Sequence, residues 1–193
     1  MVNIAIFASG SGSNAENIVR YFKSHPSISV SLILTNKADA FVIERARKLD
    51  IPSMVFSKKE MNETNLVLNL LKENKIDWII LAGFLLKVPD NIIAAFPDRI
   101  LNIHPALLPK YGGKGMYGSR VHEAVVAAGE KESGITIHLV NDHYDEGQIV
   151  FQASCPVLAS DSADDVAAKV HALEYEHFPK VIEETINEAG MIP

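Results

Sequence analysis

Short runs of β-branched and aliphatic residues alternate with amphipathic stretches along the first hundred residues of this chain. Runs that are apolar at every position are typical of strands buried on both faces, and the stretches between them have helical periodicity. The expected strands are residues 2–7, 28–34, 53–56, 78–82 and 100–103, and the expected helices are residues 14–23, 40–49 and 63–74. This order predicts an α/β fold, an open and mainly parallel twisted sheet with helices on both faces.

The sequence after Pro109 has a different character, which begins with a glycine-rich loop at residues 111–118. Polar residues separate two strand candidates there, as in a hairpin or a long loop. The expected elements are a helix at 120–128, strands at 135–140 and 149–153, and a helix from residue 162 onward, with Asp161 and Ser162 as candidate caps. We therefore predict an antiparallel addition to the sheet near the C-terminal part.

Composition and charge narrow the class of protein. With 193 residues, 48% of them hydrophobic and 22% charged, a single domain over residues 1–193 is expected. The net charge of -6 and the scattered Lys and Arg residues argue against a nucleic-acid partner. The one cysteine, Cys155, excludes an internal disulfide, and residues 78–86 are too short for the roughly 20 residues of a membrane-spanning helix. No secretory signal is visible, so we expect a cytoplasmic protein with no membrane partner.

A glycine-rich segment, residues 8–14, joins the first expected strand to the first expected helix. Free backbone N–H groups and the helix dipole attract an anion at such a junction, and glycines let the backbone approach a phosphate closely. We interpret the segment as a loop in which Gly12, Ser13 and Asn14 hold a monophosphate. A tight turn that binds nothing is the structural alternative.

The same loop also suggests a rival function. Gly10, Gly12 and Ala15 have the spacing G-x-G-x-x-A of dinucleotide-binding proteins, which would indicate a nicotinamide-dependent oxidoreductase. Such an enzyme needs an acidic residue at the end of the second strand to hold the ribose, but residues 34–37 are Leu-Thr-Asn-Lys. The lysine of a Walker A motif is missing as well. A monophosphate therefore fits the loop better than a dinucleotide.

Two polar side chains, Asn102 and His104, lie two positions apart at the end of an expected apolar strand, so both should point to the same face. Acyl transfer to an amine needs a donor for the developing oxyanion and a group that manages the proton lost by the nitrogen. An amide and an imidazole suit those roles. A later loop supplies a carboxylate, which would favour the imidazolium form of His104. Spacing does not choose among Asp142, Asp145 and Glu146.

Five further histidines lack the i, i+4 pairing or the cysteine partners of a metal site, so no metal is expected. They are His122, His138, His143, His171 and His177. We expect each to be an ordinary surface or core histidine. His138 deserves notice because it shares a strand with the loop that supplies the carboxylate.

Four segments together resemble the phosphoribosylglycinamide formyltransferases of purine synthesis, and the resemblance extends over essentially the whole chain. They are Ser9-Gly10-Ser11-Gly12-Ser13-Asn14, Leu81-Ala82-Gly83-Phe84, Leu101-Asn102-Ile103-His104-Pro105-Ala106-Leu107-Leu108-Pro109 and Asp145-x-Gly147. The Asn-x-His-Pro-x-Leu-Leu-Pro block is the most specific of the four. The resemblance implies a Rossmann-like formyltransferase fold and transfer of a formyl group from 10-formyltetrahydrofolate to the amine of 5'-phosphoribosylglycinamide (glycinamide ribonucleotide).

The resemblance also implies roles for individual residues. Asn102, His104 and Asp145 match the family's catalytic trio, and this match selects Asp145 among the three acids. The residues that match the substrate site are Gly12, Ser13 and Asn14 for the phosphate and Glu174 for the ribose hydroxyls. The residues expected to contact folate are Leu85, Leu86, Val88, Asn102, Val140 and Asp145. Residues 1–100 would then form a phosphate-binding half and residues 101–193 a catalytic and folate-binding half, in a monomer or homodimer.

Three acceptors share the Asn-x-His-Pro-x-Leu-Leu-Pro block, namely glycinamide ribonucleotide, initiator methionyl-tRNA and water. The tRNA enzyme normally carries an additional C-terminal domain and basic surface, and the hydrolase an extra N-terminal regulatory domain, neither of which we expect here. The phosphate loop favours the nucleotide. A nucleotide-binding module without catalysis is a further alternative, but it would gain nothing from Asn102 and His104.

Overall fold

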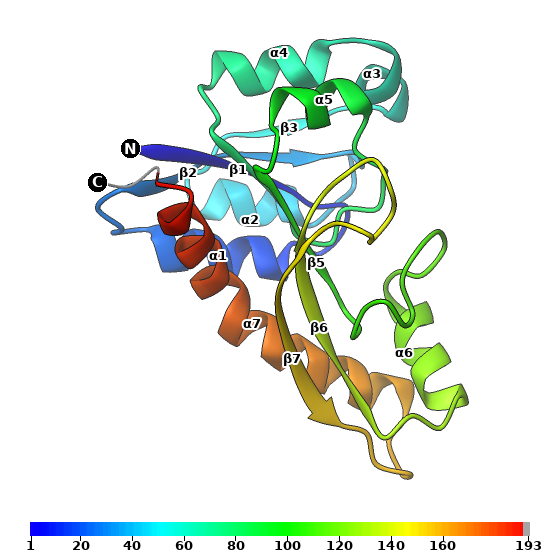
Figure 1. Ribbon diagram of the computed structural model, residues 1–193. Helices are drawn as coiled ribbons and strands as arrows, with labels where there is room; N and C mark the ends of the chain where they lie inside the picture. The colour runs from blue at the N-terminus through cyan, green and yellow to red at the C-terminus, as the bar shows by residue number, and fades with distance from the viewer. Residues whose placement is uncertain (191–193) are drawn as a thin grey trace.

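Residues 1–190, which the computed structural model describes, form one seven-stranded sheet with helices on both faces (Figure 1). The strand order is β3-β2-β1-β4-β5-β6-β7, parallel from β3 to β5 and antiparallel from β5 to β7. This confirms the predicted α/β sheet and its antiparallel addition. The elements are β1 (Val2–Phe7), α1 (Ser13–Phe22), β2 (Ile28–Thr35), α2 (Val42–Lys48), β3 (Ser53–Val55), α3 (Lys58–Glu63), α4 (Leu66–Glu73), β4 (Trp78–Leu81), α5 (Asp90–Ala95), β5 (Ile100–His104), α6 (Ser119–Ala127), β6 (Glu132–Leu139), β7 (Ile149–Pro156) and α7 (Ala163–Glu188).

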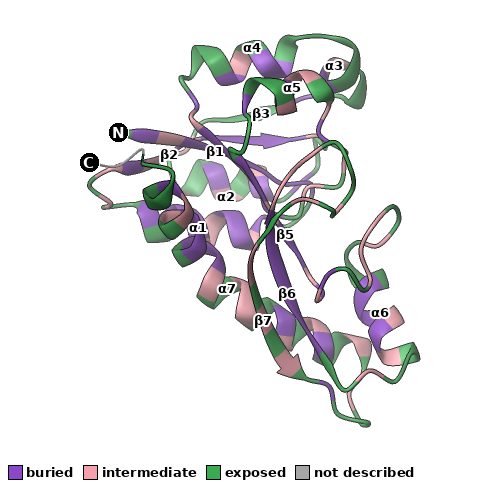
Figure 2. Cartoon of the chain, in the orientation of Figure 1, coloured by how far each residue is buried: buried purple, intermediate pink, exposed green. Residues whose placement is uncertain are grey.

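Alternate residues of β1 enter two separate cores, because successive side chains of a strand point to opposite faces of the sheet. Ile4 and Ile6 belong to the core that includes residues of α1, α2 and α7, whereas Ala5 and Phe7 belong to the core with α3, α4 and α5. Figure 2 shows the central strands buried between these layers. Burial on both faces explains why the run is apolar at every position except Asn3.

Two helices, α3 and α4, lie between β3 and β4: α4 is the helix predicted at residues 63–74, whereas α3 was not predicted. The first begins at a capping box in which Ser57 and Glu60 each accept the other's backbone N–H. Thr64 then adopts an extended conformation, donates its hydroxyl to the Glu60 carbonyl at 2.6 Å and accepts the Leu66 N–H at 3.1 Å. These side-chain bonds end one helix and start the next. Helix α5 has no counterpart among the predicted elements.

Close backbone approach requires glycine at two positions, one within β6 and one in the long loop between β6 and β7. A Cβ atom on Gly134 would lie 2.0 Å from the Ala153 carbonyl oxygen, and one on Gly147 would lie 1.6 Å from the Leu139 carbonyl oxygen. Neither position has room for a side chain. The contact at Gly147 returns the loop over the end of β6, so that Asp145 reaches the end of β5.

Helix α7 runs along one face of the sheet beside α1 (Figure 1). It begins at a capping box formed by Ser162 and Asp165, which confirms Ser162 as the cap. The Asn17 side chain donates to the Tyr175 carbonyl at 2.9 Å and joins α1 to α7. None of the helices within residues 1–190 has the length and apolar character needed to span a bilayer.

The carboxyl ends of β1, β4 and β5 meet at one edge of the sheet. The chain moves outward from β1 to β2 and β3 and then returns to place β4 on the other side of β1, which makes a topological switch point. Ser9 ties the first two of the loops at this edge together. Its N–H donates to the Gly83 carbonyl at 3.0 Å, and its hydroxyl accepts the Leu85 N–H at 3.0 Å.

Candidate active site

A cavity of about 790 Å³ opens at this edge of the sheet. Ligand cavities in proteins typically measure about 300–1,000 Å³, so a nucleotide-sized molecule fits. The cavity joins the glycine-rich loop, the end of β5 and the loop after β6. Every residue assigned a role from the sequence lines it, namely Gly12, Ser13, Asn14, Leu85, Leu86, Val88, Asn102, His104, Val140, Asp145 and Glu174.

The glycine-rich loop ends at Gly12, which caps the N-terminus of α1 with a left-handed backbone conformation (φ 71°). A Cβ atom on Gly12 would lie 2.3 Å from the Val42 side chain, so both the conformation and the packing require glycine. No side chain caps the helix. The first N–H groups of α1 are therefore available to an anion in the cavity.

Helix α2 supports this loop from outside the cavity. The Val42 N–H donates to the Gly10 carbonyl at 3.2 Å, and Arg45 Nε donates to the Ser11 carbonyl at 2.7 Å. Arg45 also forms an ion pair with Glu16 on α1. The hydrogen bond from Arg45 partly neutralises the negative end of the Ser11 carbonyl, which reduces its repulsion of an anion bound at the loop. Arg45 was not identified from the sequence, because its contact crosses 34 positions.

Glu174 on α7 faces the N-terminus of α1. Its Oε2 atom accepts Asn14 Nδ2 at 2.8 Å and lies 3.0 Å from His171 Nδ1. Asn14 Oδ1 is buried and has no hydrogen-bond partner among residues 1–190. This corner of the cavity therefore offers a carboxylate and a free amide oxygen, both suited to accept hydroxyl groups of a ligand.

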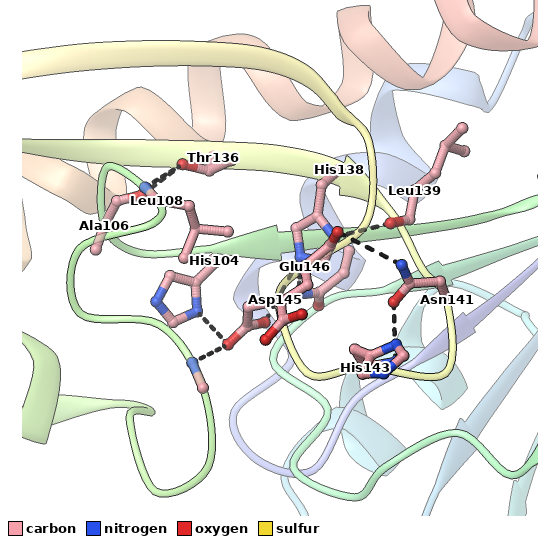
Figure 3. A network of polar contacts seen from close by, with 12 residues as sticks. His104, Ala106, Leu108, Thr136, His138, Leu139, Asn141, His143, Asp145 and Glu146 are labelled. Carbon is pink, nitrogen blue, oxygen red and sulfur yellow. Dashed lines mark hydrogen bonds and ion pairs between the residues drawn. The ribbon is translucent and has the colours of Figure 1, made fainter.

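His104 lies at the other end of the cavity and is almost fully buried. Its Nε2 atom is 2.7 Å from the Tyr111 carbonyl oxygen, and because a carbonyl only accepts, Nε2 carries the proton. The other ring nitrogen, Nδ1, lies 3.7 Å from Asp145 Oδ2 (Figure 3). A neutral His104 thus presents its basic nitrogen beside a carboxylate.

Asn102 is held by a second buried histidine, His138, which faces it across the β5–β6 pair. The Leu139 carbonyl lies 2.9 Å from His138 Nδ1, so this nitrogen donates and Nε2 is free to accept Asn102 Nδ2 at 3.0 Å. One N–H of the Asn102 amide is used in this way, and the other remains. The sequence marked His138 as worth notice but gave it no role, because its partner lies on another strand.

Asp145 lies between the two histidines, with Oδ1 3.6 Å from His138 Nε2 (Figure 3). Its Oδ2 atom accepts the Gly113 N–H at 2.8 Å. Burial opposes ionisation of this carboxyl, but the Gly113 N–H and the charge of His104 in its protonated form favour the carboxylate, and the pKa lies below the usual value. Asp145 is therefore a carboxylate at neutral pH.

The ionisation of His104 depends on burial of the ring as well as on the expected carboxylate. Burial lowers the pKa of His104 below its ordinary value, and this outweighs the charge of Asp145 and the Tyr111 carbonyl, which both raise it. Asp145, 3.7 Å away, therefore favours the imidazolium form as expected, but burial of the ring has the larger effect in the protein without ligands. His104 is a neutral base that Asp145 is placed to assist.

Apolar side chains form the wall between these two ends. Leu85, Leu86 and Val88 follow β4, and Val140 faces the cavity from the end of β6. Such a surface suits the faces of an aromatic ring system. Within residues 1–190, no group of three or more His, Cys, Asp or Glu side chains is arranged to hold a metal ion.

Comparisons with known proteins agree with this geometry. Residues 2–182 match the family described as Formyl transferase. A protein from Vigna unguiculata named phosphoribosylglycinamide formyltransferase, chloroplastic, is 40% identical over 193 residues, which cover 96% of this chain and 61% of that protein. Phosphoribosylglycinamide formyltransferase from Haemophilus influenzae is 35% identical over 187 residues, which cover 94% of this chain and 86% of that protein. A crystal structure of phosphoribosylglycinamide formyltransferase from Bacillus halodurans has a TM-score of 0.86 at 32% identity, covering 97% of this chain and 96% of that one.

The chain spans less than two thirds of the length of the Vigna unguiculata relative. That relative is named as chloroplastic, so the cytoplasmic location expected for this protein stays a prediction. The resemblance found in the motifs is confirmed over nearly the whole chain. On the family match and on the shared fold of the solved relatives, this chain belongs to the formyl transferase family.

Proposed function

We propose that this protein transfers the formyl group of 10-formyltetrahydrofolate to the amine of 5'-phosphoribosylglycinamide, giving formylglycinamide ribonucleotide in purine synthesis. The observation that carries the proposal is the meeting of an amide, an imidazole and a carboxylate in one cavity that also contains a free helix N-terminus. The relatives compared above are named for this activity.

Asn102 acts on the formyl oxygen. This oxygen gains negative charge when the amine adds to the formyl carbon, and a fixed N–H donor stabilises that charge most effectively in a site shielded from water. His138 holds one N–H of Asn102 at 3.0 Å and leaves the second N–H for the formyl oxygen. His138 is thus a positioning residue, and Asn102 is the catalytic residue that it orients.

His104 takes the proton that the nitrogen loses. The Tyr111 carbonyl fixes the proton on Nε2, so Nδ1 is the atom that accepts the new one. Burial keeps the ring neutral beforehand. Asp145, 3.7 Å from Nδ1, stabilises the imidazolium once the proton has arrived. The bond between the formyl carbon and N10 of the folate then breaks, and the departing N10 takes the proton back from His104, which leaves tetrahydrofolate and the formylated amine.

The acceptor substrate binds at the opposite end of the cavity. Gly12, Ser13 and Asn14 hold its phosphate through the N-terminus of α1. Glu174 accepts hydrogen bonds from the ribose hydroxyls and is already oriented by Asn14. The amine at the far end of this substrate then points toward His104.

The donor binds along the apolar wall, and it supplies the formyl group. Leu85, Leu86, Val88 and Val140 contact the pterin faces, while Asn102 and Asp145 lie at the reacting end. Residues 1–100 in this proposal supply the phosphate-binding half and also the three pterin contacts after β4. Residues 101–193 supply the catalytic and folate-binding half, of which 191–193 lie outside the described part. The partners are small molecules, and a cytoplasmic monomer or homodimer stays a prediction.

The test is an assay of the purified protein with 10-formyltetrahydrofolate and glycinamide ribonucleotide, followed by folate absorbance and by detection of the formylated product. Control reactions omit the nucleotide, which leaves water as the acceptor, or replace the folate with formate. Folate turnover that depends on the nucleotide is the expected result. Equal turnover without the nucleotide would identify a hydrolase, and binding of the nucleotide without turnover would identify a binding module.

A further inference from the structure

His122 is a buried histidine in the cavity that the proposed mechanism does not use. It lies on α6, is only 7% exposed and lines the cavity. Its Nδ1 atom is buried and has no hydrogen-bond partner among residues 1–190. Nearly all buried polar atoms are hydrogen-bonded, because an unmade bond leaves the loss of hydration uncompensated. A partnerless nitrogen beside a ligand cavity points to a ligand group as its partner.

The position of His122 identifies the part of the cavity that it serves. His122 lines the same cavity as Glu174 at the ribose end and His104 at the formyl-transfer end. Helix α6 also packs against α7, which carries Glu174. We therefore assign His122 to the part of the cavity that a ligand crosses between the ribose end and the formyl-transfer end.

The part of the substrate between the ribose and the amine contains a secondary amide. In glycinamide ribonucleotide the ribose is joined to the amine through one amide group and one methylene group. With the ribose at Glu174 and the amine at His104, the amide falls between them, beside His122. A neutral imidazole nitrogen donates to the amide oxygen in one tautomer and accepts the amide N–H in the other. His122 can therefore bind either the C=O or the N–H of the amide.

We propose that His122 is a substrate-binding residue whose Nδ1 atom hydrogen-bonds the glycinamide amide of the acceptor. The inference rests on the proposed function and deepens it. His122 does not contact the reacting atoms. Its contribution is to hold the flexible arm so that the amine faces the formyl carbon, which is the kind of orientation that raises the rate of a two-substrate reaction.

The test compares the wild-type protein with His122→Phe, which fills similar space without a polar atom. Removing a buried nitrogen that has no partner should leave the thermal midpoint of the free protein unchanged or higher. Calorimetry should show that glycinamide ribonucleotide binds about tenfold more weakly, as expected for the loss of one hydrogen bond. Ribose 5-phosphate, which lacks the glycinamide arm, should bind both proteins equally.

Two further variants separate the outcomes. His122→Asn places an amide near the position of Nδ1 and should restore most of the affinity for the nucleotide, whereas Glu174→Gln should weaken both ligands. If His122→Phe does not fold, His122→Leu takes its place in the comparison. Equal nucleotide affinity in the wild type and the apolar variant would overturn this inference alone, as would an equal loss for ribose 5-phosphate. A wild type that does not bind the nucleotide would overturn the proposed function too.

Discussion

At the scale of single residues, the Asn102 amide is the group whose removal should affect turnover most directly. Asn102→Ala should lower kcat by about 10²–10³, because one preorganised oxyanion donor is lost. Its fold should persist, since His138 keeps the Leu139 carbonyl as a partner. Steady-state kinetics and thermal unfolding measure the two effects, and Asn69→Ala on the exposed side of α4 serves as a control that changes neither. Turnover equal to the wild type would remove Asn102 from the mechanism.

The pKa of His104 gives a second test at this scale. Burial holds it below the ordinary value, while the charge of Asp145 raises it. Asp145→Asn removes that charge, so the His104 midpoint should move to still lower pH. Imidazole nitrogen resonances recorded by NMR over the acidic range measure it. Asp142→Asn is the matched control, because this acid is exposed and pairs with His143 instead. An upward shift in Asp145→Asn would contradict the conclusion that the Asp145 charge raises the pKa of His104.

At the scale of elements, the glycine-rich loop offers a test with its own control two residues away. Gly12→Ala should destabilise the protein by roughly 1–3 kcal/mol and weaken phosphate binding, since alanine is strained at this φ. The added Cβ would also lie 2.3 Å from the Val42 side chain. Gly10→Ala meets no atom within 4 Å and should change the free energy of unfolding little. Urea unfolding measures both variants, and equal losses would show that the loop tolerates a side chain at Gly12.

Elements that carry their own local signal could be predicted from the sequence. The central strands are buried on both faces and are therefore mostly apolar, and Ser162 is both a predicted and an observed cap. The break between α3 and α4 could not be read from hydrophobic periodicity, because the Thr64 hydroxyl makes it. Ser57 and Glu60 have the spacing of a capping box in the sequence, and this pattern could have located the start of α3.

The contacts that complete the site are less accessible to sequence reasoning. The glycine-rich loop and the end of β5 can be identified from sequence motifs, because each motif consists of a few consecutive residues. His138 meets Asn102 across 36 positions, and Glu174 meets Asn14 across 160. Pairings of that kind depend on the register of β5 with β6 and on the path of α7 over the sheet. The partners of these side chains are known only from the folded structure. The ionisation of His104 depends on such partners and on burial, so it could not be predicted from the sequence.

At the scale of the whole molecule, the cavity is built from both halves of the chain. The phosphate loop and the wall after β4 come from the first hundred residues, and the amide, the two histidines and Asp145 come from the rest. The sheet is continuous across this division through the pairing of β4 with β5. A ligand that spans the cavity therefore contacts segments on both sides of that pairing.

This arrangement predicts that the acceptor substrate stabilises the protein as a whole. Glycinamide ribonucleotide at a hundred times its Kd should raise the free energy of unfolding by about 2.7 kcal/mol, as mass action requires. Because the substrate spans the cavity, hydrogen exchange should slow in both α1 and β6, whereas inorganic phosphate, which reaches only the glycine-rich loop, should protect α1 alone. Hydrogen exchange followed by mass spectrometry distinguishes these patterns. Protection confined to α1 with the full nucleotide would mean that its glycinamide arm does not reach the end of β5, and the placement of the amine beside His104 would then be wrong.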